Sequence, residues 1–568
     1  MKKIRKMKLP VYLLLLLAAA CTAPAPAPVS EVKSAIYEGV EFEMPMVVEP
    51  TFADLSVSIV EHGAISDGQT LNSQAFADAI AEVAGKGGGR VVVPRGIWLT
   101  GPIILKSNIN LHLEAGALVI FSKNKDLYPL IETSFEGLNT VRCLSPIYGK
   151  DLENIAITGD GVIDGSGDAW RFVKRSKMTD SQWEDLVNSG GIVDESGKNW
   201  FPSESFKKGF EMSDMNVPDQ FTTMDEFEEI KDFLRPVMVS LVSCKNVLLD
   251  GPVFQNSPAW NIHPLMCENL TVRNIDVRNP WYSQNGDGLD IESCKNTVLY
   301  NSRFDVGDDA ICVKSGKDKD GRDRGIPNEN LIVKNCIVYH GHGGVTVGSE
   351  MSGGVKNMHV SGCTFIGTDV GLRFKSTRGR GGVVEGIYIS DIDMIDIPTN
   401  AISFNLYYGG LSVSEMLEQQ DGNQGEAEMM EVTEETPQFK DISIKNVTVK
   451  GALQAIYLQG LPEMNLENIR LENLVMEAEN GLFCMDANGV VINNIELKTT
   501  KFPAVDFYNA QNVSIKNLAV ETGGQPVISV NGSKTEKVDI TLRSGETSDD
   551  VLSLGAMVNP DEVKVSNQ

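Results

Sequence analysis

The sequence has few positive charges and few of the residues that bind metals or form disulfides. Its 568 residues include 50 Lys and Arg against 77 Asp and Glu, which gives a formal net charge of −27. This balance excludes a uniformly basic nucleic-acid-binding protein, because a polyanion would meet a repulsive long-range field. Nine cysteines and six histidines occur, without CxxC or His-rich spacing. We therefore expect no disulfide framework, no structural zinc and no cofactor.

The composition is otherwise that of a globular protein. With 42% hydrophobic and 22% charged residues, it excludes wholesale disorder and a multi-span membrane protein. The first residues are basic, an apolar run at 11–20 is too short to span a bilayer, and Cys21 follows three alanines.

This N-terminus is similar to a bacterial lipoprotein signal, so we expect residues 1–20 to be a signal peptide and Cys21 to carry a lipid. The alternative is an ordinary secretory signal with a chance cysteine. Either signal predicts an exported protein, and the first predicts a periplasmic or outer-membrane-anchored lipoprotein that meets the membrane only through this lipid. Residues 21–50 then form a tether and an N-terminal extension.

A short motif recurs along the chain. It consists of Asn, Asp or Gly, then alternating apolar and variable residues, then Asn, Gly or Asp, and it starts at 154, 246, 269, 296, 330, 357, 386, 441, 468, 489 and 512. Alternation of this kind gives a strand one apolar face, and stacked units bury that face. The repeat therefore predicts an all-β fold, a right-handed parallel β-helix. An antiparallel sandwich is the alternative, but the hairpin dipeptides that it needs are sparse.

The chain before the repeats predicts a cap. Residues 71–84 have helical periodicity, and strands begin within 87–116, so we expect an N-terminal capping helix that covers the open end of the first coil. We expect one β-helix domain over 51–560, with insertions at about 167–234 and 410–438. Cysteines at equal offsets within successive repeats, such as Cys244 and Cys267, predict stacked buried thiols.

A second set of strands predicts a column of polar side chains. GLDIES at 288, AICVKS at 310, GVTVGS at 344 and GLRFKS at 371 share one template, and AWNIHP at 259 and AISFNL at 401 follow its first five positions. Their third and fifth residues point outward. The predicted column contains Asn261, His263, Asp290, Glu292, Cys312, Lys314, Thr346, Gly348, Arg373, Lys375, Ser403 and Asn405. It predicts a surface groove for a polar ligand.

Acidic residues cluster just before these strands. Asp287, Asp308 and Asp309 belong to successive coils, and His342 is expected beside Asp308. Clustered carboxylates repel, so at least one should keep its proton near neutral pH. A protonated acid beside ionised partners is what glycosidic bond cleavage requires. The alternatives for an Asp-Asp pair are turn chemistry and a Ca²⁺ site.

Four cations follow within eight residues, at Arg373, Lys375, Arg378 and Arg380. A guanidinium group suits a carboxylate bidentately, so this patch indicates an anionic ligand. The alternative is that Arg373 and Lys375 pair with the column's own acids, Asp290 and Glu292.

Four motifs together resemble a known family. NGDG at 285, GDD at 307, GHG at 341 and RFK at 373 are similar, in this order, to the NTD, DD, GHG and RIK signatures of glycoside hydrolase family 28, the polygalacturonases. GAISDG at 63, LKSNINLHLEAGA at 105 and ITGDGVIDGSGDAW at 157 also resemble the family's early coils. Gly286 and Phe374 depart from the signatures.

The resemblance implies inverting hydrolysis of α-1,4-linked galacturonate without a metal. Asp308 would be the general acid, Asp287 and Asp309 would hold and activate the water, and His342 would tune Asp308. For the ligand, an anionic pectic polysaccharide or oligogalacturonide, the expected binding residues are Arg373, Lys375, Asn285, His263, Lys314, Arg378, and either Tyr407 or Tyr408.

Action from chain ends is expected for two reasons. The 167–234 insertion, with Trp170, Trp183 and Trp200, could wall off one end of the groove, and RGRGG at 378–382 looks like exo-acting bacterial members. Rhamnogalacturonan and xylogalacturonan remain alternative polymers. A Ca²⁺-dependent β-helix pectate lyase and a non-catalytic polysaccharide-binding solenoid remain alternative functions. We expect a monomer.

Overall fold

A computed structural model describes residues 35–212, 216–218, 220–408, 429–520, 527–543 and 551–567. Residues 40–568 form one compact unit, and 35–39 belong to a separate N-terminal unit. The expected signal peptide, Cys21 and most of the 410–438 insertion lie outside the described residues. Within the described ranges, no helix is both long enough and apolar enough to cross a membrane.

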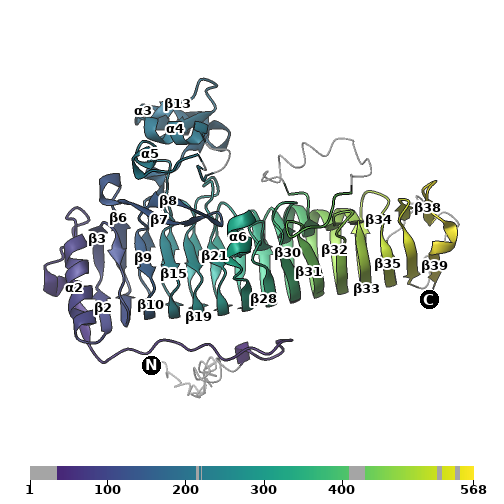
Figure 1. The fold of residues 1–568 in the computed structure, drawn as a ribbon, viewed down its shortest axis with the longest axis horizontal. Helices are drawn as coiled ribbons and strands as arrows, with labels where there is room; N and C mark the ends of the chain where they lie inside the picture. Colours follow the sequence, from purple (N-terminus) through teal and green to yellow (C-terminus); the bar gives the residue numbers. More distant parts are fainter. Residues whose placement is uncertain are drawn as a thin grey trace, which may run out of the picture. The chain divides into compact units, whose positions relative to one another are not determined.

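The compact unit is a right-handed parallel β-helix, which confirms the predicted fold (Figure 1). In one of its sheets, each strand pairs in parallel with the equivalent strand of the next coil. The repeat motifs lie on the strands of this sheet, namely β10 (Glu153–Gly159), β16 (Lys245–Asp250), β19 (Glu268–Arg273), β22 (Lys295–Tyr300), β25 (Asn328–Lys334), β28 (Val355–Ile366), β30 (Val383–Asn405), β31 (Gln438–Gln459), β32 (Leu466–Met485), β33 (Ala487–Thr499) and β35 (Gln511–Val520).

The asparagine that opens many repeats has a structural reason. Asn246 and Asn269 have φ angles of 53° and 59°, a left-handed conformation that asparagine tolerates better than most residues. The side-chain amide of Asn269 donates to Asn246 Oδ1 at 3.0 Å, and Asn246 donates to Asn154 at 3.1 Å. The ladder continues through Asn296, Asn330 and Asn357. Each rung ties one coil to the coil before it.

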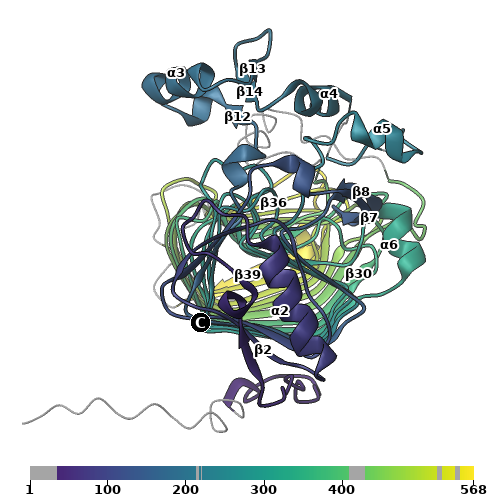
Figure 2. The same ribbon diagram turned by 90° about the vertical axis from the view of Figure 1, so that its left-hand side faces the viewer.

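The interior is apolar along the unit, with the inward-facing valines, leucines and isoleucines in one continuous core. Cys244, Cys267 and Cys294 are buried free thiols in this core, as are Cys336 and Cys363. This confirms the prediction of stacked buried thiols. At the N-terminal end of the coils, α2 (Ser73–Gly85) packs Phe76 and Ile80 onto the same core and forms the predicted cap (Figure 2).

A second sheet carries the predicted polar column. Its central strands are β18 (Ile262–Leu265), β21 (Leu289–Glu292), β24 (Ile311–Lys314), β27 (Gly343–Val347) and β29 (Val370–Lys375). From β21 onward the register is the predicted one, with Asp290 opposite Cys312 and Thr346 opposite Arg373.

The prediction for the segment at 259 is wrong by two residues. Ile262 pairs with Leu289 and Leu265 with Glu292, so the backbone of His263 lies opposite Asp290 and not opposite Glu292, although the His263 side chain reaches Glu292. The template fails there because Ala259 and Trp260 pack in a separate cluster with Phe135.

Residues 167–234 lie outside the coils (Figure 1). They contain α3 (Asp180–Asn188), α4 (Glu204–Met212), α5 (Met224–Glu228) and a small sheet of β12 (Val173–Lys174), β13 (Ile192–Val193) and β14 (Asn199–Phe201). Trp170 packs among phenylalanines, and Trp183 and Trp200 pack with Val173. The three tryptophans are therefore packed in hydrophobic clusters, and the expectation that the insertion walls off one end of the groove stays a prediction.

One element was not predicted. An antiparallel hairpin of β7 (Leu130–Phe135) and β8 (Leu138–Cys143) lies outside the parallel sheet. Its alternating sequence was visible, but a hairpin cannot be told from a coil strand by alternation alone.

The asparagine ladder gives a first testable prediction. Replacing Asn269 with Ala removes two rungs and places a β-carbon in the left-handed region without a compensating amide, so we expect a loss of about 2 kcal/mol in the free energy of unfolding. Asn269→Gly also loses both side-chain hydrogen bonds, but glycine adopts the left-handed conformation without strain. This variant should therefore lose less free energy of unfolding than Asn269→Ala. Urea unfolding of the three proteins measures this order, and equal stability of the Ala variant and the parent would refute the role of the ladder.

Candidate active site

The predicted acids meet because each lies just before a strand of the second sheet. Asp287 precedes β21, Asp309 precedes β24, and His342 precedes β27. These strands are neighbours in successive coils. Ligand atoms of Asp287, Asp309 and Cys312 lie within 4.8 Å of one another, so the predicted pairing of Asp287 with Asp309 is confirmed.

Asp309 is held as a carboxylate by two cations. Arg373 Nη1 lies 3.1 Å from its Oδ1, Lys375 Nζ lies 2.8 Å from its Oδ2, and the Thr346 hydroxyl donates to Oδ1 at 2.9 Å. Burial opposes the charge on Asp309, but Lys375 and Arg373 outweigh burial and hold the pKa of Asp309 well below its usual range. Asp309 is therefore ionised at neutral pH.

The pKa values of Asp287 and Asp290 shift in the opposite direction to that of Asp309. Burial, together with the Asp290 and Asp308 carboxylates, raises the pKa of Asp287 well above its usual range. Burial also raises the pKa of Asp290 to about 8, although Lys314 lies 3.4 Å from it and opposes the shift. The expectation that at least one acid of the cluster keeps its proton near neutral pH is thus met by Asp287 and Asp290.

Asp308 is the accessible acid of the cluster. Its side chain is 23% exposed, whereas those of Asp309 and Asp290 are 2% or less exposed. His342 Nδ1 lies 3.5 Å from Asp308 Oδ1, and the other ring nitrogen lies 3.6 Å from Asp369. The predicted neighbourhood of Asp308 and His342 is confirmed. The Asp309 backbone N–H donates to Asp308 Oδ1 at 3.0 Å, so the carboxylate is held at one oxygen and remains accessible to a ligand, with His342 beside it.

The N-terminal half of the column is closed instead of open. His263 is 1% exposed and Lys314 is 4% exposed. His263 Nε2 lies 2.8 Å from Glu292, which also pairs with Arg324 of α6 (Asp318–Arg324) at 2.6 Å.

The hairpin and α6 form the roof over this half. The Lys317 backbone N–H donates to Gly137 O at 3.0 Å, and the Asn139 N–H donates to Asp320 at 3.0 Å. The prediction of an open groove at His263 and Lys314 is therefore corrected. Both residues lie inside the wall, where Lys314 pairs with Glu350 at 3.1 Å and lies 4.0 Å from the centre of the Trp260 ring.

Arg235 is a functional candidate that the sequence did not reveal. It is 1% exposed, and it donates to Asn285 Oδ1 at 2.8 Å and to Gln284 O at 3.0 Å. Arg235 follows the 167–234 insertion directly in sequence and fixes the loop that carries Asp287. Asn285 is thereby held by the protein, and it adopts a left-handed φ of 52°. No motif around Arg235 distinguishes it from a surface arginine.

The C-terminal half of the column is open. Tyr408 covers the two cations, with its ring centre 4.8 Å from Lys375 Nζ and 5.6 Å from the Arg373 guanidinium carbon. Tyr408, Arg373 and Lys375 help to line a cleft of about 110 Å³. The Tyr407 hydroxyl is buried, and the Tyr407 ring packs against the core. Of the two candidate tyrosines, Tyr408 is therefore the one that lines the cleft.

The basic patch is neutralised within the protein. Arg373 and Lys375 pair with Asp309 and not with Asp290 and Glu292 as the alternative proposed. Arg378 binds Glu463 bidentately at 2.6 and 2.8 Å, and Arg380 pairs with Asp318. Of the four cations, Arg373 and Lys375 line the open cleft, and Arg378 and Arg380 do not.

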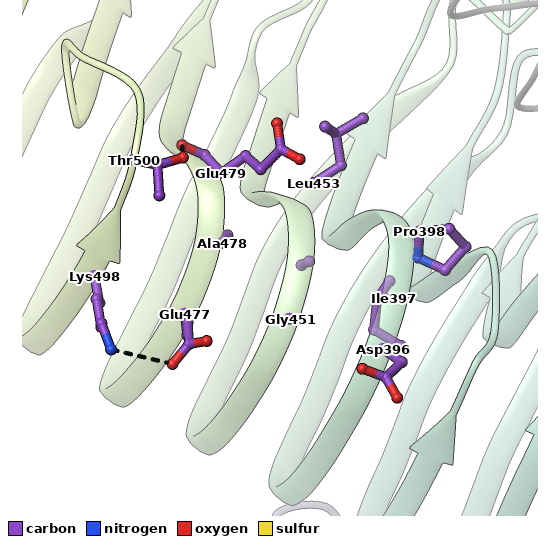
Figure 3. Close-up of a pocket in the computed structure, with 11 residues that line it drawn as sticks. Asp396, Ile397, Pro398, Gly451, Leu453, Glu477, Ala478, Glu479, Lys498 and Thr500 are labelled. Atoms are coloured by element: carbon purple, nitrogen blue, oxygen red, sulfur yellow. Dashed lines mark hydrogen bonds and ion pairs between the residues drawn. The ribbon is translucent and has the colours of Figure 1, made fainter.

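A larger cavity of about 520 Å³ lies elsewhere, on the turn before the second sheet (Figure 3). It is lined by Asp396, Glu477 and Glu479 with Lys498, which pairs with Glu477 at 3.5 Å. The carboxylates of the acid cluster do not line it. We therefore take the cluster beside the 110 Å³ cleft as the candidate active site, because chemistry depends on the groups present and not on volume.

Asp287, Asp309 and Cys312 also fit the distance criterion for a metal site. Burial, however, raises the pKa of Cys312 well above its usual range, so the thiol keeps its proton and is a poor ligand. Lys375 and Arg373 already neutralise Asp309. The cluster is better suited to acid–base chemistry.

The raised pKa of Asp290 predicts a pH-dependent stability. Between about 4 and about 8 the folded protein keeps a proton that the unfolded chain releases, so the contribution of this group to the free energy of unfolding falls as pH rises through that range. Asp290→Asn should reduce this slope, with the contribution of Asp287 remaining, and raise the thermal midpoint relative to the parent at pH 8. Asp539→Asn, at an exposed acid, is the matched control. An unchanged slope in the Asp290 variant would contradict the assignment.

Comparison with known proteins supports the resemblance that the motifs indicated. The sequence model of glycosyl hydrolases family 28 matches residues 229–481. The chain is 30% identical over 349 residues to a probable polygalacturonase of Vitis vinifera, covering 60% of each protein. It is 29% identical over 415 residues to an exo-poly-alpha-D-galacturonosidase of Dickeya chrysanthemi, covering 71% of this chain and 64% of that protein. The chain thus spans about three fifths of the length of these curated relatives.

Solved structures agree with the sequence comparison. An exopolygalacturonase of Thermotoga maritima superposes with a TM-score of 0.62 at 29% identity, covering 87% of this chain and 96% of that one. A family 28 exopolygalacturonase of Yersinia enterocolitica, with a TM-score of 0.60 at 23% identity over 84% of this chain and 80% of that one, shares the fold. The four motifs, the geometry of the acids and these similarities agree: residues 229–481 match the glycosyl hydrolases family 28, and the fold is shared with exopolygalacturonases.

Proposed function

We propose that the protein hydrolyses α-1,4-galacturonosidic bonds of pectin with inversion at the anomeric carbon. The observation that carries this proposal is that the acids of the cluster differ in exposure and in pKa. Asp308 is accessible, and Asp309 is ionised beside a buried Asp287. Two carboxyl groups with different environments are what glycoside hydrolysis needs.

In the proposed reaction, Asp308 protonates the glycosidic oxygen of the leaving sugar. Asp287 and Asp309, whose oxygens lie within 4.8 Å of each other, hold one water between them, and the ionised Asp309 takes a proton from it. The water attacks the anomeric carbon from the face opposite the leaving group, which gives inversion. His342 orients Asp308 and remains a positioning residue.

Arg373 and Lys375 have a double role in this proposal. In the free protein both neutralise Asp309, and both line the cleft beside Tyr408. A substrate carboxylate entering the cleft would therefore share these cations with Asp309. Asn285, His263, Lys314 and Arg378 are held by internal partners, so we assign them to shaping the site instead of contacting the sugar.

Cleavage from chain ends is supported by the roof over the column. The hairpin and α6 close the groove on the N-terminal side of the acids, so a polymer can extend only toward the C-terminal coils. The contacts that support this closure belong to the β7–β8 hairpin and α6, whereas the sequence predicted it from the 167–234 insertion.

We further propose that the protein is an exported monomer, lipid-anchored through Cys21 in the periplasm or at the outer membrane, after removal of residues 1–20. The sequence pattern of the N-terminus supports this location. The substrate is then an anionic pectic polysaccharide or oligogalacturonide outside the cytoplasm. Rhamnogalacturonan or xylogalacturonan would fit the same acid–base geometry, and product analysis on a panel of pectic polymers decides between them.

Asp308→Asn tests the general acid. Loss of the proton donor should lower kcat on polygalacturonate by about 10³-fold while binding of the polymer persists. Asp305→Asn is the matched control, since Asp305 lies in the same coil as Asp308, is exposed, and pairs with His340 of the next coil. Full activity of the Asp308 variant would contradict the assignment, and a product that absorbs as an unsaturated uronate would point to a lyase.

The closed groove makes a separate prediction about products. Monogalacturonate should dominate from the first minutes of polygalacturonate digestion, and viscosity should fall only as fast as reducing ends accumulate. Chromatography of early products together with viscometry measures both. Early release of mixed longer oligomers with a rapid collapse of viscosity would show internal cleavage and overturn the exo assignment.

A further inference from the structure

The polar column continues past the catalytic cluster, and its next coils carry aromatic rings. We propose that Tyr457 and Phe483 form a platform that binds further sugar rings of the polymer on the leaving-group side of the cleavage point. The inference rests on the proposed function, because it names where the remainder of the same substrate lies.

The register of the second sheet places these rings in line with the catalytic cations. Arg373 pairs with Ser403, Ser403 pairs with Tyr457, and Tyr457 pairs with Phe483. At about 4.8 Å per coil, Tyr457 lies roughly 10 Å and Phe483 roughly 14 Å beyond Arg373. A polymer held at Arg373 and directed toward the C-terminal coils would pass over both rings.

The two rings stack on one another and form a rigid aromatic pair. Their centroids are 5.2 Å apart and their planes differ by 21°, so they stack. Both side chains are partly exposed, and the Tyr457 hydroxyl donates to Gln459 at 2.5 Å, which fixes its ring. Rigid aromatic surfaces of this kind bind with little loss of conformational entropy.

The neighbouring cleft is suited to sugar hydroxyls. Tyr457 lines the 110 Å³ cleft together with Gln454 and Asn480. The Gln454 amide donates to Gly481 O at 2.6 Å, and the Asn480 amide donates to Leu453 O at 2.9 Å. These bonds hold the two amides along the cleft wall with their oxygens as acceptors. The cleft therefore runs from the cations to the aromatic platform.

Charge directs the polymer along this path and not into the larger cavity. Leu453 lines both hollows, but the larger one carries Asp396, Glu477 and Glu479 (Figure 3), which would repel a uronate. Tyr457 and Phe483 are uncharged, and the acid that follows them in register, Asp506, pairs with Phe483 in the next coil and marks the C-terminal limit of the platform. The exposed parts of the stacked rings would thus contact C–H groups of the sugars while the carboxylates point to solvent.

The test compares ligands of two lengths in the intact protein. Calorimetry in the Asp308→Asn background, which prevents turnover, gives the affinities for digalacturonate and pentagalacturonate. We expect the longer ligand to bind more tightly, and Phe483→Ala to reduce that length-dependent gain about tenfold, as loss of a stacked aromatic contact implies. Phe483→Tyr should keep it. Tyr388→Ala removes a partly exposed ring that packs on Phe42 elsewhere and should also keep it.

The outcomes separate the two proposals. If the parent binds neither ligand, the proposed function fails. If the parent binds both and the length-dependent gain is the same in the Phe483→Ala variant, the platform is wrong and the function stands. Thermal unfolding of each variant shows whether it is folded, and Tyr457→Phe provides a second probe because it keeps the ring but releases Gln459.

Discussion

Parallel hydrogen bonding between successive coils is the constraint on which the rest of the structure depends. It fixes a spacing of about 4.8 Å and sets each residue directly above its equivalent in the previous coil, as in the pairing of Asp290 with Cys312 and of Thr346 with Arg373. Residues far apart in sequence thereby become neighbours. The asparagine ladder, the stacked thiols and the acid cluster all follow from this one register.

The same stacking brings acidic side chains close together, and the repulsion between them gives the acids of the site different pKa values. It packs Asp287, Asp290 and Asp309 into a buried region where like charges repel, and only Asp309 has two cations to neutralise it. One acid is consequently ionised while its neighbours keep protons. The overall charge of −27 gives no hint of this arrangement, since the residues that matter are neutralised locally and 167–234 alone carries fifteen acids against eight basic residues.

Much of the fold could be predicted because alternation and asparagine spacing are local signals. The strands follow from alternation and the cap at α2 from helical periodicity. The meeting of Asp287, Asp308, Asp309 and His342 follows from counting residues between repeats. The roof over His263 and Lys314 could not be predicted in this way, because it depends on the contacts of a hairpin with α6, nearly two hundred residues further along the chain. Arg235 was missed for the same reason.

The ion-pair partners of the cations could not be predicted from the sequence either. Spacing placed Arg373 and Lys375 on one outward face, but only side-chain positions show that both reach Asp309 and that Arg378 turns to Glu463. The account therefore depends on a buried, ionised Asp309 that activates water opposite Asp308. Its most direct test is the anomeric form of the first sugar released from trigalacturonate, followed by NMR. The account predicts that β-galacturonate appears first and then mutarotates, whereas initial release of the α-anomer or of an unsaturated product would contradict it.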